Sequence, residues 1–241
     1  MDKNTKYTKD LYNKHAVAYT ASIEKGRFYN KYIDMPAIKK IITGIKGKKV
    51  LDVGCGPGTY TSYFASKGAT VCAIDISEEM IKLTHKKVPS AEVRVADMNK
   101  IPYPSGAFDL VFYGLSIHYL KDILPTLKEA YRVLKNKGRL VISTGNPAIN
   151  GARLVDINGE RMFVMENYFG AMTEQWQMVP GMIVKNYTKN IAGLINPVSN
   201  AGFRITKITE PKPAASSKKQ HTDAYKRTTT APSFIIIEAE K

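Results

Sequence analysis

The chain has 241 residues, of which 44% are hydrophobic and 24% are charged. This composition excludes a disordered segment or a fibrous repeat and indicates a globular protein with its own core. No apolar run approaches the roughly 18 residues of a membrane span, and the first residues hold no apolar stretch typical of a signal peptide, so we expect a cytoplasmic protein with no membrane span.

Lys and Arg outnumber Asp and Glu by 36 to 21, which gives a net charge of +15. Such an excess raises nucleic acid, an anionic membrane or an acidic small molecule as partners. Most of the charge is scattered Lys, whereas nucleic-acid binding concentrates Arg and Lys on one face. The pattern therefore favours a solvated, lysine-rich surface. The two cysteines, Cys55 and Cys72, lie in apolar segments without nearby His and indicate neither a metal site nor a disulfide framework.

The first 44 residues carry a helical pattern and predict an N-terminal helical lid, followed by a main domain over 45–241. From residue 48 onward, apolar runs alternate with helical patterns, which is typical of a parallel sheet with crossover helices. Strands are predicted at 48–53, 69–74, 91–97, 108–114 and 138–145, and helices at 59–68, 77–87 and 121–135.

Residues 146–190 break this alternation, and their mixture of Asn, Gly, Met and aromatic residues shows no steady period. We expect an insertion that covers the substrate rather than further sheet. Its large side chains could form an apolar wall for the acceptor or plain core: Tyr168, Phe169, Met172, Trp176 and Met178. Two final strands are predicted at 206–211 and 233–240, separated by the polar, basic stretch 212–227.

The sequence DVGCGPG at residues 52–58 follows the first predicted strand and precedes a helix. In an open parallel sheet this is where ligands bind, because the backbone amides of the turn are free and glycine lets a ligand approach. A dinucleotide fingerprint needs a third small residue where this chain has Thr59, so NAD is disfavoured. A phosphate-binding loop is excluded because no Gly-Lys-Ser/Thr follows.

Two acids follow the next strands. Asp75 ends the second strand, where a carboxylate can accept both ribose hydroxyls of an adenosine nucleoside. Asp97, beside Met98, ends the third strand, where it could bind an adenine amino group while Met98 packs on the ring. Each acid alone could also be an ordinary residue at the end of a strand. Together with the glycine turn, they indicate a nucleoside site.

These segments resemble the successive motifs of class I S-adenosylmethionine-dependent methyltransferases: VLDVGCGPG, AIDIS, VADMNKIPYPSGAFDLVFYGLSIHYL and VLKNKGRLVIS. They are similar to the bacterial small-molecule branch near the ubiquinone and menaquinone methyltransferases. LYNKHAVAY near the start, and LINPVSNAGFRITKITEPKP with PSFIIIEAEK near the end, resemble that branch more weakly. The resemblance implies an α/β, Rossmann-like fold whose seven-stranded, mostly parallel sheet has an antiparallel last strand.

The resemblance also implies a site for S-adenosylmethionine, with S-adenosylhomocysteine as the product and no metal. The glycines of the turn would contact the methionine moiety, Asp75 the ribose, and Asp97 with Met98 the adenine, while Tyr12 and Tyr19 would close over the cofactor. The full set of candidate cofactor-binding residues is Tyr12, Tyr19, Asp52, Gly54, Gly56, Gly58, Asp75, Ile76, Asp97, Met98 and Tyr113.

His118 follows the fourth strand, where the methyl acceptor would approach. In the resembling branch, a His at this place is proposed as the base in some C-methylating members, and an imidazole near neutrality can deprotonate a phenol or enol. Equally, His118 could only hydrogen-bond the cofactor or the loop. Relatives often have His-Pro at Asn146-Pro147 and His-Arg-Thr at residues 186–188, so the acceptor pocket is not a copy of theirs.

The resulting prediction is an enzyme that transfers a methyl group by in-line displacement to O, N or C of a small, anionic or aromatic acceptor. The net charge motivates an RNA or tRNA methyltransferase as an alternative. Against this, the chain has neither Pro-Pro-Tyr nor a Pro-Cys nucleophile after the fourth strand. A non-catalytic module that binds S-adenosylmethionine or S-adenosylhomocysteine is the second alternative.

Overall fold

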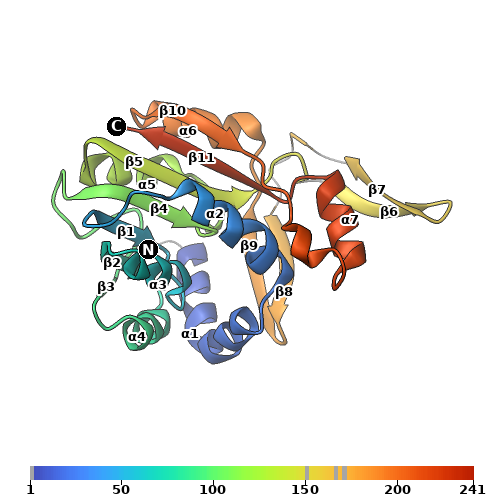
Figure 1. Cartoon of the computed structure of the whole chain (residues 1–241), viewed down its shortest axis with the longest axis horizontal. Coiled ribbons are helices and arrows are strands. Elements are labelled where there is room, and N and C mark those ends of the chain that lie inside the picture. Colours follow the sequence, from blue (N-terminus) through green and yellow to red (C-terminus); the bar gives the residue numbers. More distant parts are fainter. Residues whose placement is uncertain (1–2, 150–151, 166–167, 170–172) are drawn as a thin grey trace.

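The central element of the computed structural model, which describes residues 3–149, 152–165, 168–169 and 173–241, is a seven-stranded sheet (Figure 1). Its strand order is β10-β11-β5-β4-β1-β2-β3. The strands are β1 (Lys49–Val53), β2 (Thr70–Asp75), β3 (Glu92–Val95), β4 (Phe108–Gly114), β5 (Leu134–Gly145), β10 (Arg204–Thr209) and β11 (Phe234–Glu240). β1 to β5 pair in parallel, and β11 runs antiparallel to both of its neighbours. The predicted fold class is confirmed.

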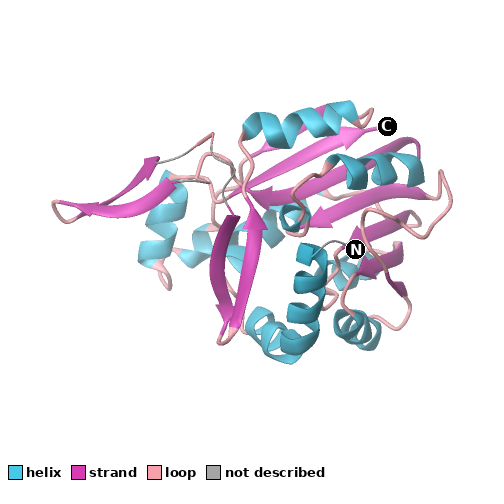
Figure 2. Cartoon of the chain, turned by 180° about the vertical axis from the view of Figure 1, so that it is seen from behind, coloured by secondary structure: helices cyan, strands magenta, loops and turns pink. Residues whose placement is uncertain are grey.

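Helices pack on both faces of this sheet (Figures 1 and 2). They are α2 (Met35–Ile41), α3 (Thr59–Ser66), α4 (Glu78–Lys87), α5 (Leu124–Val133) and α6 (Ile191–Asn200). In β4, Val111 and Tyr113 are buried against α5 and α6, whereas Leu110 and Phe112 are buried against α2 and α3. Successive side chains of a strand point to opposite faces, so the continuous apolar sequence of β4 fits a strand covered on both sides.

The start of α4 illustrates how the sequence sets a helix boundary. Ser77 precedes the helix, and its hydroxyl accepts a hydrogen bond from the backbone N–H of Met80 at 3.2 Å. Glu78 and Glu79 in the first turn complement the positive end of the helix dipole. The predicted cap is confirmed, and it fixes where the chain leaves β2.

The N-terminal segment forms α1 (Lys3–Glu24), followed by a short π-helix, η1 (Asn30–Asp34). Among its described contacts, α1 packs against α4 and the strands β8 (Thr173–Val179) and β9 (Met182–Tyr187). Tyr12 and Ala16 are its buried residues, and they join a small core with Met80 and Met182. No helix in the described ranges is long and apolar enough to cross a membrane.

The expectation that residues 146–190 contain no sheet was wrong. Two hairpins form there, β6 (Ala152–Ile157) with β7 (Glu160–Met165), and β8 with β9. The first turns at Asn158-Gly159, both with positive φ, which is the strongest short-range hairpin signal. In Figure 1 the β6–β7 hairpin extends away from the main sheet. The basic stretch before β11 also contains two short helices, η3 (Ala215–Ser217) and α7 (Thr222–Thr230).

Candidate active site

The three glycines after β1 perform different tasks. All have positive φ, +72° at Gly54, +53° at Gly56 and +78° at Gly58, a conformation that other residues adopt only with strain. A Cβ on Gly54 would lie 2.5 Å from the Cβ of Ser116, and one on Gly58 would lie 3.1 Å from side-chain atoms of Thr84. A Cβ on Gly56 would meet nothing within 4 Å. Gly54 and Gly58 therefore allow close packing, whereas Gly56 leaves open space.

That open space belongs to a cavity of about 940 Å³ beyond the carboxyl ends of the parallel strands. This volume is at the upper end of the range for small-molecule sites. Most of the predicted site residues line it: Tyr12, Tyr19, Gly54, Gly56, Asp75, Ile76, Asp97, Met98 and His118. The structure thus brings together residues from α1 and from the segments after β1, β2, β3 and β4.

Asp52, Gly58 and Tyr113 do not line the cavity, which differs from the candidate set. Asp52 is buried and accepts a hydrogen bond from the Thr61 hydroxyl at 2.7 Å, and burial raises its pKa to about 7. Tyr113 is buried in the core, where its hydroxyl donates to the backbone oxygen of Thr126 at 3.1 Å. Gly58 packs on α4. We therefore assign these three residues to support of the site rather than to its surface.

Asp75 connects the glycine turn to the start of α4. One of its carboxylate oxygens accepts from the backbone N–H of Gly56 at 2.8 Å, and the other from that of Ser77 at 2.9 Å. Burial raises the pKa of Asp75, while these backbone donors oppose the shift by stabilising the charged form. Asp97 is held in a similar way, since it accepts from the backbone N–H of Asn99 at 2.8 Å. Both carboxylates are thus fixed at the cavity wall.

Three tyrosines form an aromatic corner of the cavity. The ring of Tyr12 meets that of Tyr19 edge to face with 5.2 Å between centroids, and that of Tyr119 with 5.8 Å. The hydroxyls of Tyr12 and Tyr119 are hydrogen-bonded to each other. Burial, and then the neighbouring Tyr119, raise the pKa of Tyr12, so its hydroxyl stays neutral. The hydrogen bond between Tyr12 and Tyr119 joins α1 to the segment after β4.

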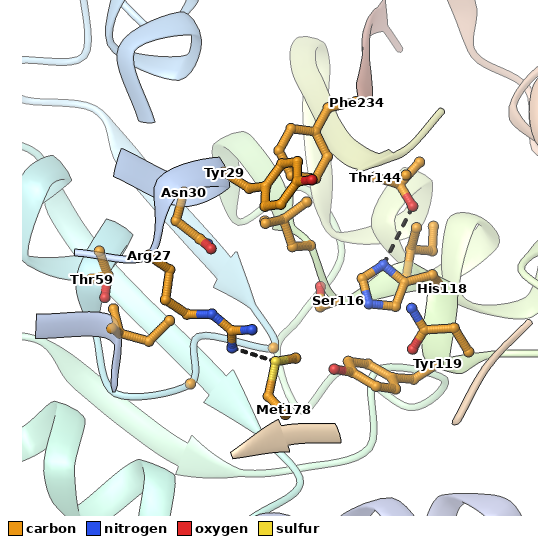
Figure 3. Close-up of a pocket in the computed structure, with 18 of the residues that line it drawn as sticks. Arg27, Tyr29, Asn30, Thr59, Ser116, His118, Tyr119, Thr144, Met178 and Phe234 are labelled. Atoms are coloured by element: carbon orange, nitrogen blue, oxygen red, sulfur yellow. Dashed lines mark hydrogen bonds between the residues drawn. The ribbon is translucent and has the colours of Figure 1, made fainter. Parts of the chain in front are cut away.

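His118 lies on the cavity wall within a short 3₁₀ turn, η2 (Ile117–Tyr119), after β4 (Figure 3). Its Nδ1 is 3.4 Å from the hydroxyl oxygen of Thr144 at the end of β5. Burial, reinforced by the positive charge of Lys189, lowers the pKa of His118 to about 3. The imidazole is therefore neutral at pH 7, where it can accept a proton in a hydrogen bond but is a weak base by itself.

Arg27 is a cavity residue that the sequence analysis missed. It follows α1, and its guanidinium donates to the sulfur of Met178 in β8. In Figure 3, it reaches toward the cavity between Thr59 and Met178. No described carboxylate pairs with it. No motif marks this residue, so its position becomes visible only when α1 is folded over the strand ends.

Of the side chains predicted for an acceptor wall or plain core, Trp176 and Met178 line the cavity. Phe163 of β7, which the sequence analysis did not single out, lines it too. Phe169 is 85% exposed, and the Tyr168 hydroxyl accepts from the backbone N–H of Ile191. Met172, also predicted for this wall, lies outside the described residues.

Comparisons with known proteins agree with this geometry. A family model described as a methyltransferase domain matches residues 51–142. The chain is 32% identical over 108 residues to malonyl-[acyl-carrier protein] O-methyltransferase of Salmonella typhimurium, and 33% identical over 125 residues to demethylmenaquinone methyltransferase of Listeria welshimeri. These matches cover 45% and 48% of this chain, and 43% and 53% of the relatives, so the chain spans about half the length of these curated relatives.

A crystal structure from Listeria monocytogenes, described as a candidate S-adenosylmethionine-dependent methyltransferase, is 26% identical and superposes with a TM-score of 0.76. The match covers 86% of this chain and 96% of that one. The resemblance noted in the sequence and the predicted fold are both confirmed.

Proposed function

We propose, from the match of residues 51–142 to a methyltransferase domain model, that this chain transfers a methyl group from S-adenosylmethionine to a small-molecule acceptor. The observation that carries the proposal is that the Gly56 backbone opens onto a cavity of about 940 Å³, with Asp75 and His118 on its wall. The relatives with named small acceptors support the same class of substrate.

The residues present fit the cofactor. The open space at Gly56 would admit the amino-acid part against the backbone, and the fixed carboxylate of Asp75 would accept from the ribose hydroxyls. Asp97 and Met98 would bind the adenine, and the guanidinium of Arg27 is available for the carboxylate of the methionine moiety. When bound, S-adenosylmethionine supplies a methyl carbon already activated by its sulfonium.

The protein's main task is then to align the acceptor and exclude water. Holding a nucleophile behind the methyl carbon can supply about 7–11 kcal/mol of the barrier. With its Nδ1–H donating to Thr144, His118 would keep Nε2 as an acceptor for a hydroxyl or amine of the substrate. Because the pKa of His118 is about 3, we assign its imidazole mainly to orienting that hydroxyl or amine. The imidazole would accept the group's proton only as the methyl is transferred.

Two measurements test the proposal in sequence. S-adenosylhomocysteine should raise the melting temperature of the protein, and NAD should not. Labelled S-adenosylmethionine is then incubated with the protein and with cell extract separated into small-molecule, protein and RNA fractions. Label in the small-molecule fraction is expected. Label confined to RNA, or a melting shift without any label transfer, would contradict the proposal and favour an RNA methyltransferase or a binding module, respectively.

A further inference from the structure

The segment between β10 and β11 forms one end of the cavity. The two strands are antiparallel neighbours, yet residues 210–233 lie between them in the chain and hold η3 and α7. Arg227 and Thr228 of α7 line the cavity, as do Ala231 and Ser233 just after it. The basic stretch that the sequence marked as a separator therefore contributes directly to the ligand space.

This segment is fastened to the chain around η1. The ring of His221 lies 5.3 Å from that of Phe28 and 5.3 Å from that of Tyr32. The backbone N–H of Ala214 donates to the backbone oxygen of Tyr32 at 2.7 Å. η1 is also bound to the main sheet, because the buried carboxyl of Asp34 accepts a hydrogen bond from the hydroxyl of Ser143 in β5. The cavity end bounded by η1 and α7 is thus a built wall.

Two cationic side chains belong to this wall. The guanidinium of Arg227 makes no ion pair or hydrogen bond to any residue that the structure describes, although Arg227 lines the cavity. Lys31 of η1 also lines the cavity, and its ammonium lies 5.1 Å from the ring centroid of Tyr32, with no described carboxylate as a partner. Five guanidinium N–H donors beside a cavity favour an anion, which they can bind in a bidentate manner.

The carboxylates of the cavity wall are engaged elsewhere. Glu24 pairs with Lys87 at 3.5 Å, and Asp75 and Asp97 accept from backbone N–H groups. η1 and α7 carry two acids of their own, Asp34 and Asp223, but neither lines the cavity. Asp34 is buried and accepts hydrogen bonds from the hydroxyls of Ser143 and Tyr60. The charge that is left uncompensated at this end is therefore positive.

The same end also offers apolar surface. The rings of Tyr29 and Phe234 meet edge to face with 6.3 Å between centroids, and Figure 3 shows both facing the cavity on the side opposite Met178. Ala231, Pro147 and Ile149 continue this lining. A ligand with a flat apolar body and an anionic group would match both parts of the wall.

We propose that Arg227, with Lys31, binds a carboxylate or phosphate group of the methyl acceptor, and that the acceptor's apolar body lies against Tyr29 and Phe234. This inference rests on the proposed function, which supplies the cofactor at the glycine turn. It names the class of acceptor as an anionic compound with an aromatic or similarly flat body.

The test uses Trp176, the single tryptophan of the chain, which lines the cavity and reports occupancy by its fluorescence. The protein is first saturated with S-adenosylhomocysteine, and calorimetry verifies that this step succeeds. Phenylacetate, phenyl phosphate and the neutral isostere phenylacetamide are then titrated. At least one of the two anions should bind about tenfold or more tightly than the amide, as expected for charge-assisted hydrogen bonds. The two anions distinguish a carboxylate site from a phosphate site.

Arg227→Gln should abolish the preference for the anion and leave S-adenosylhomocysteine affinity unchanged. Lys226→Gln is the matched control, because it removes one positive charge from the neighbouring, exposed position of α7 that does not line the cavity. Its preference should equal that of the wild type. Melting curves check that both variants fold.

Equal binding of anions and amide, no binding of any of the three probes, or a preference that survives Arg227→Gln would overturn the inference. Failure of S-adenosylhomocysteine to bind would instead count against the proposed function, so the two results are distinguishable.

Discussion

Gly56→Val is the sharpest test of the glycine turn. The residue has φ of +53°, and a Cβ there enters open space without touching the protein. The folded protein should therefore be destabilised only by the backbone strain of a non-glycine residue in the left-handed conformation, about 1–2 kcal/mol. For a chain of this length, that corresponds to a fall in melting temperature of about 2–8 °C. The variant should stay folded.

The effect on ligand binding should be larger. The valine side chain would occupy the space through which a ligand reaches the backbone of the turn, and a steric overlap of that kind costs about 1–3 kcal/mol. We therefore expect S-adenosylhomocysteine affinity to fall about tenfold to a hundredfold or more, measured by isothermal titration calorimetry. The wild-type protein measured in the same buffer gives the reference affinity.

Gly106→Val provides the matched control. Gly106 has φ of +66°, a Cβ there also meets nothing within 4 Å, and the residue does not line the cavity. It should show a similar fall in melting temperature and unchanged affinity. Unchanged affinity in folded Gly56→Val, or an equal loss in Gly106→Val, would refute the assignment of the turn as the cofactor site.

Three other outcomes are expected. His118→Ala should lower kcat about a hundredfold and leave the affinity for S-adenosylhomocysteine unchanged. Because the pKa of His118 is about 3, a histidine ionisation between about pH 5 and 8 that appears in kcat/KM of the wild type and not of His118→Ala would contradict this assignment. Asp52→Asn should gain stability relative to wild type as the pH rises from about 4 to 7. Over this range the folded Asp52 carboxyl, with a pKa of about 7, retains a proton that the unfolded carboxyl, with a pKa near 3.9, has lost. A difference in melting temperature between the two proteins that stays constant over this range would contradict the raised pKa. Gly54→Ala should cost about 2–5 kcal/mol in urea unfolding, since its Cβ would approach that of Ser116 to 2.5 Å and φ is +72°, and a near-neutral effect would show that the turn relaxes.

The sequence was sufficient to predict the central strands β1, β2, β4, β5 and β11, because they are largely buried and therefore appear as short apolar runs bounded by Gly and polar residues. Asp75 ends β2 and Asp97 follows the end of β3 by two residues, and both line the cavity, since residues at and just beyond the carboxyl end of a parallel strand face the crevice. Asp52 and Tyr113 lie inside strands, and alternation directs their side chains into the helices that cover the sheet. Strand position, rather than proximity to a motif, separates the two cases.

The remaining cavity residues depend on contacts between distant parts of the chain. Arg27 and Arg227 lie 200 positions apart in the sequence, and neither belongs to a motif. Their places on the wall follow from how α1 and α7 fold over the strand ends, which no local pattern encodes. By contrast, the Asn158-Gly159 turn was a local signal that the lack of a longer periodicity in residues 146–190 concealed.

The order of the strands has a consequence for biosynthesis. β11 lies between β10 and β5 in the sheet but is the last of the described strands, so β10 gains its described partner only when β11 emerges from the ribosome and inserts. During synthesis the N-terminal segments of a chain are available before the C-terminal ones, and pairings between distant segments form slowly. We expect the nascent chain to complete the glycine turn first and the wall containing Phe234 afterwards. If the proposed function holds, a chain stalled before β11 would recognise the methyl donor while lacking a place for the molecule that receives it.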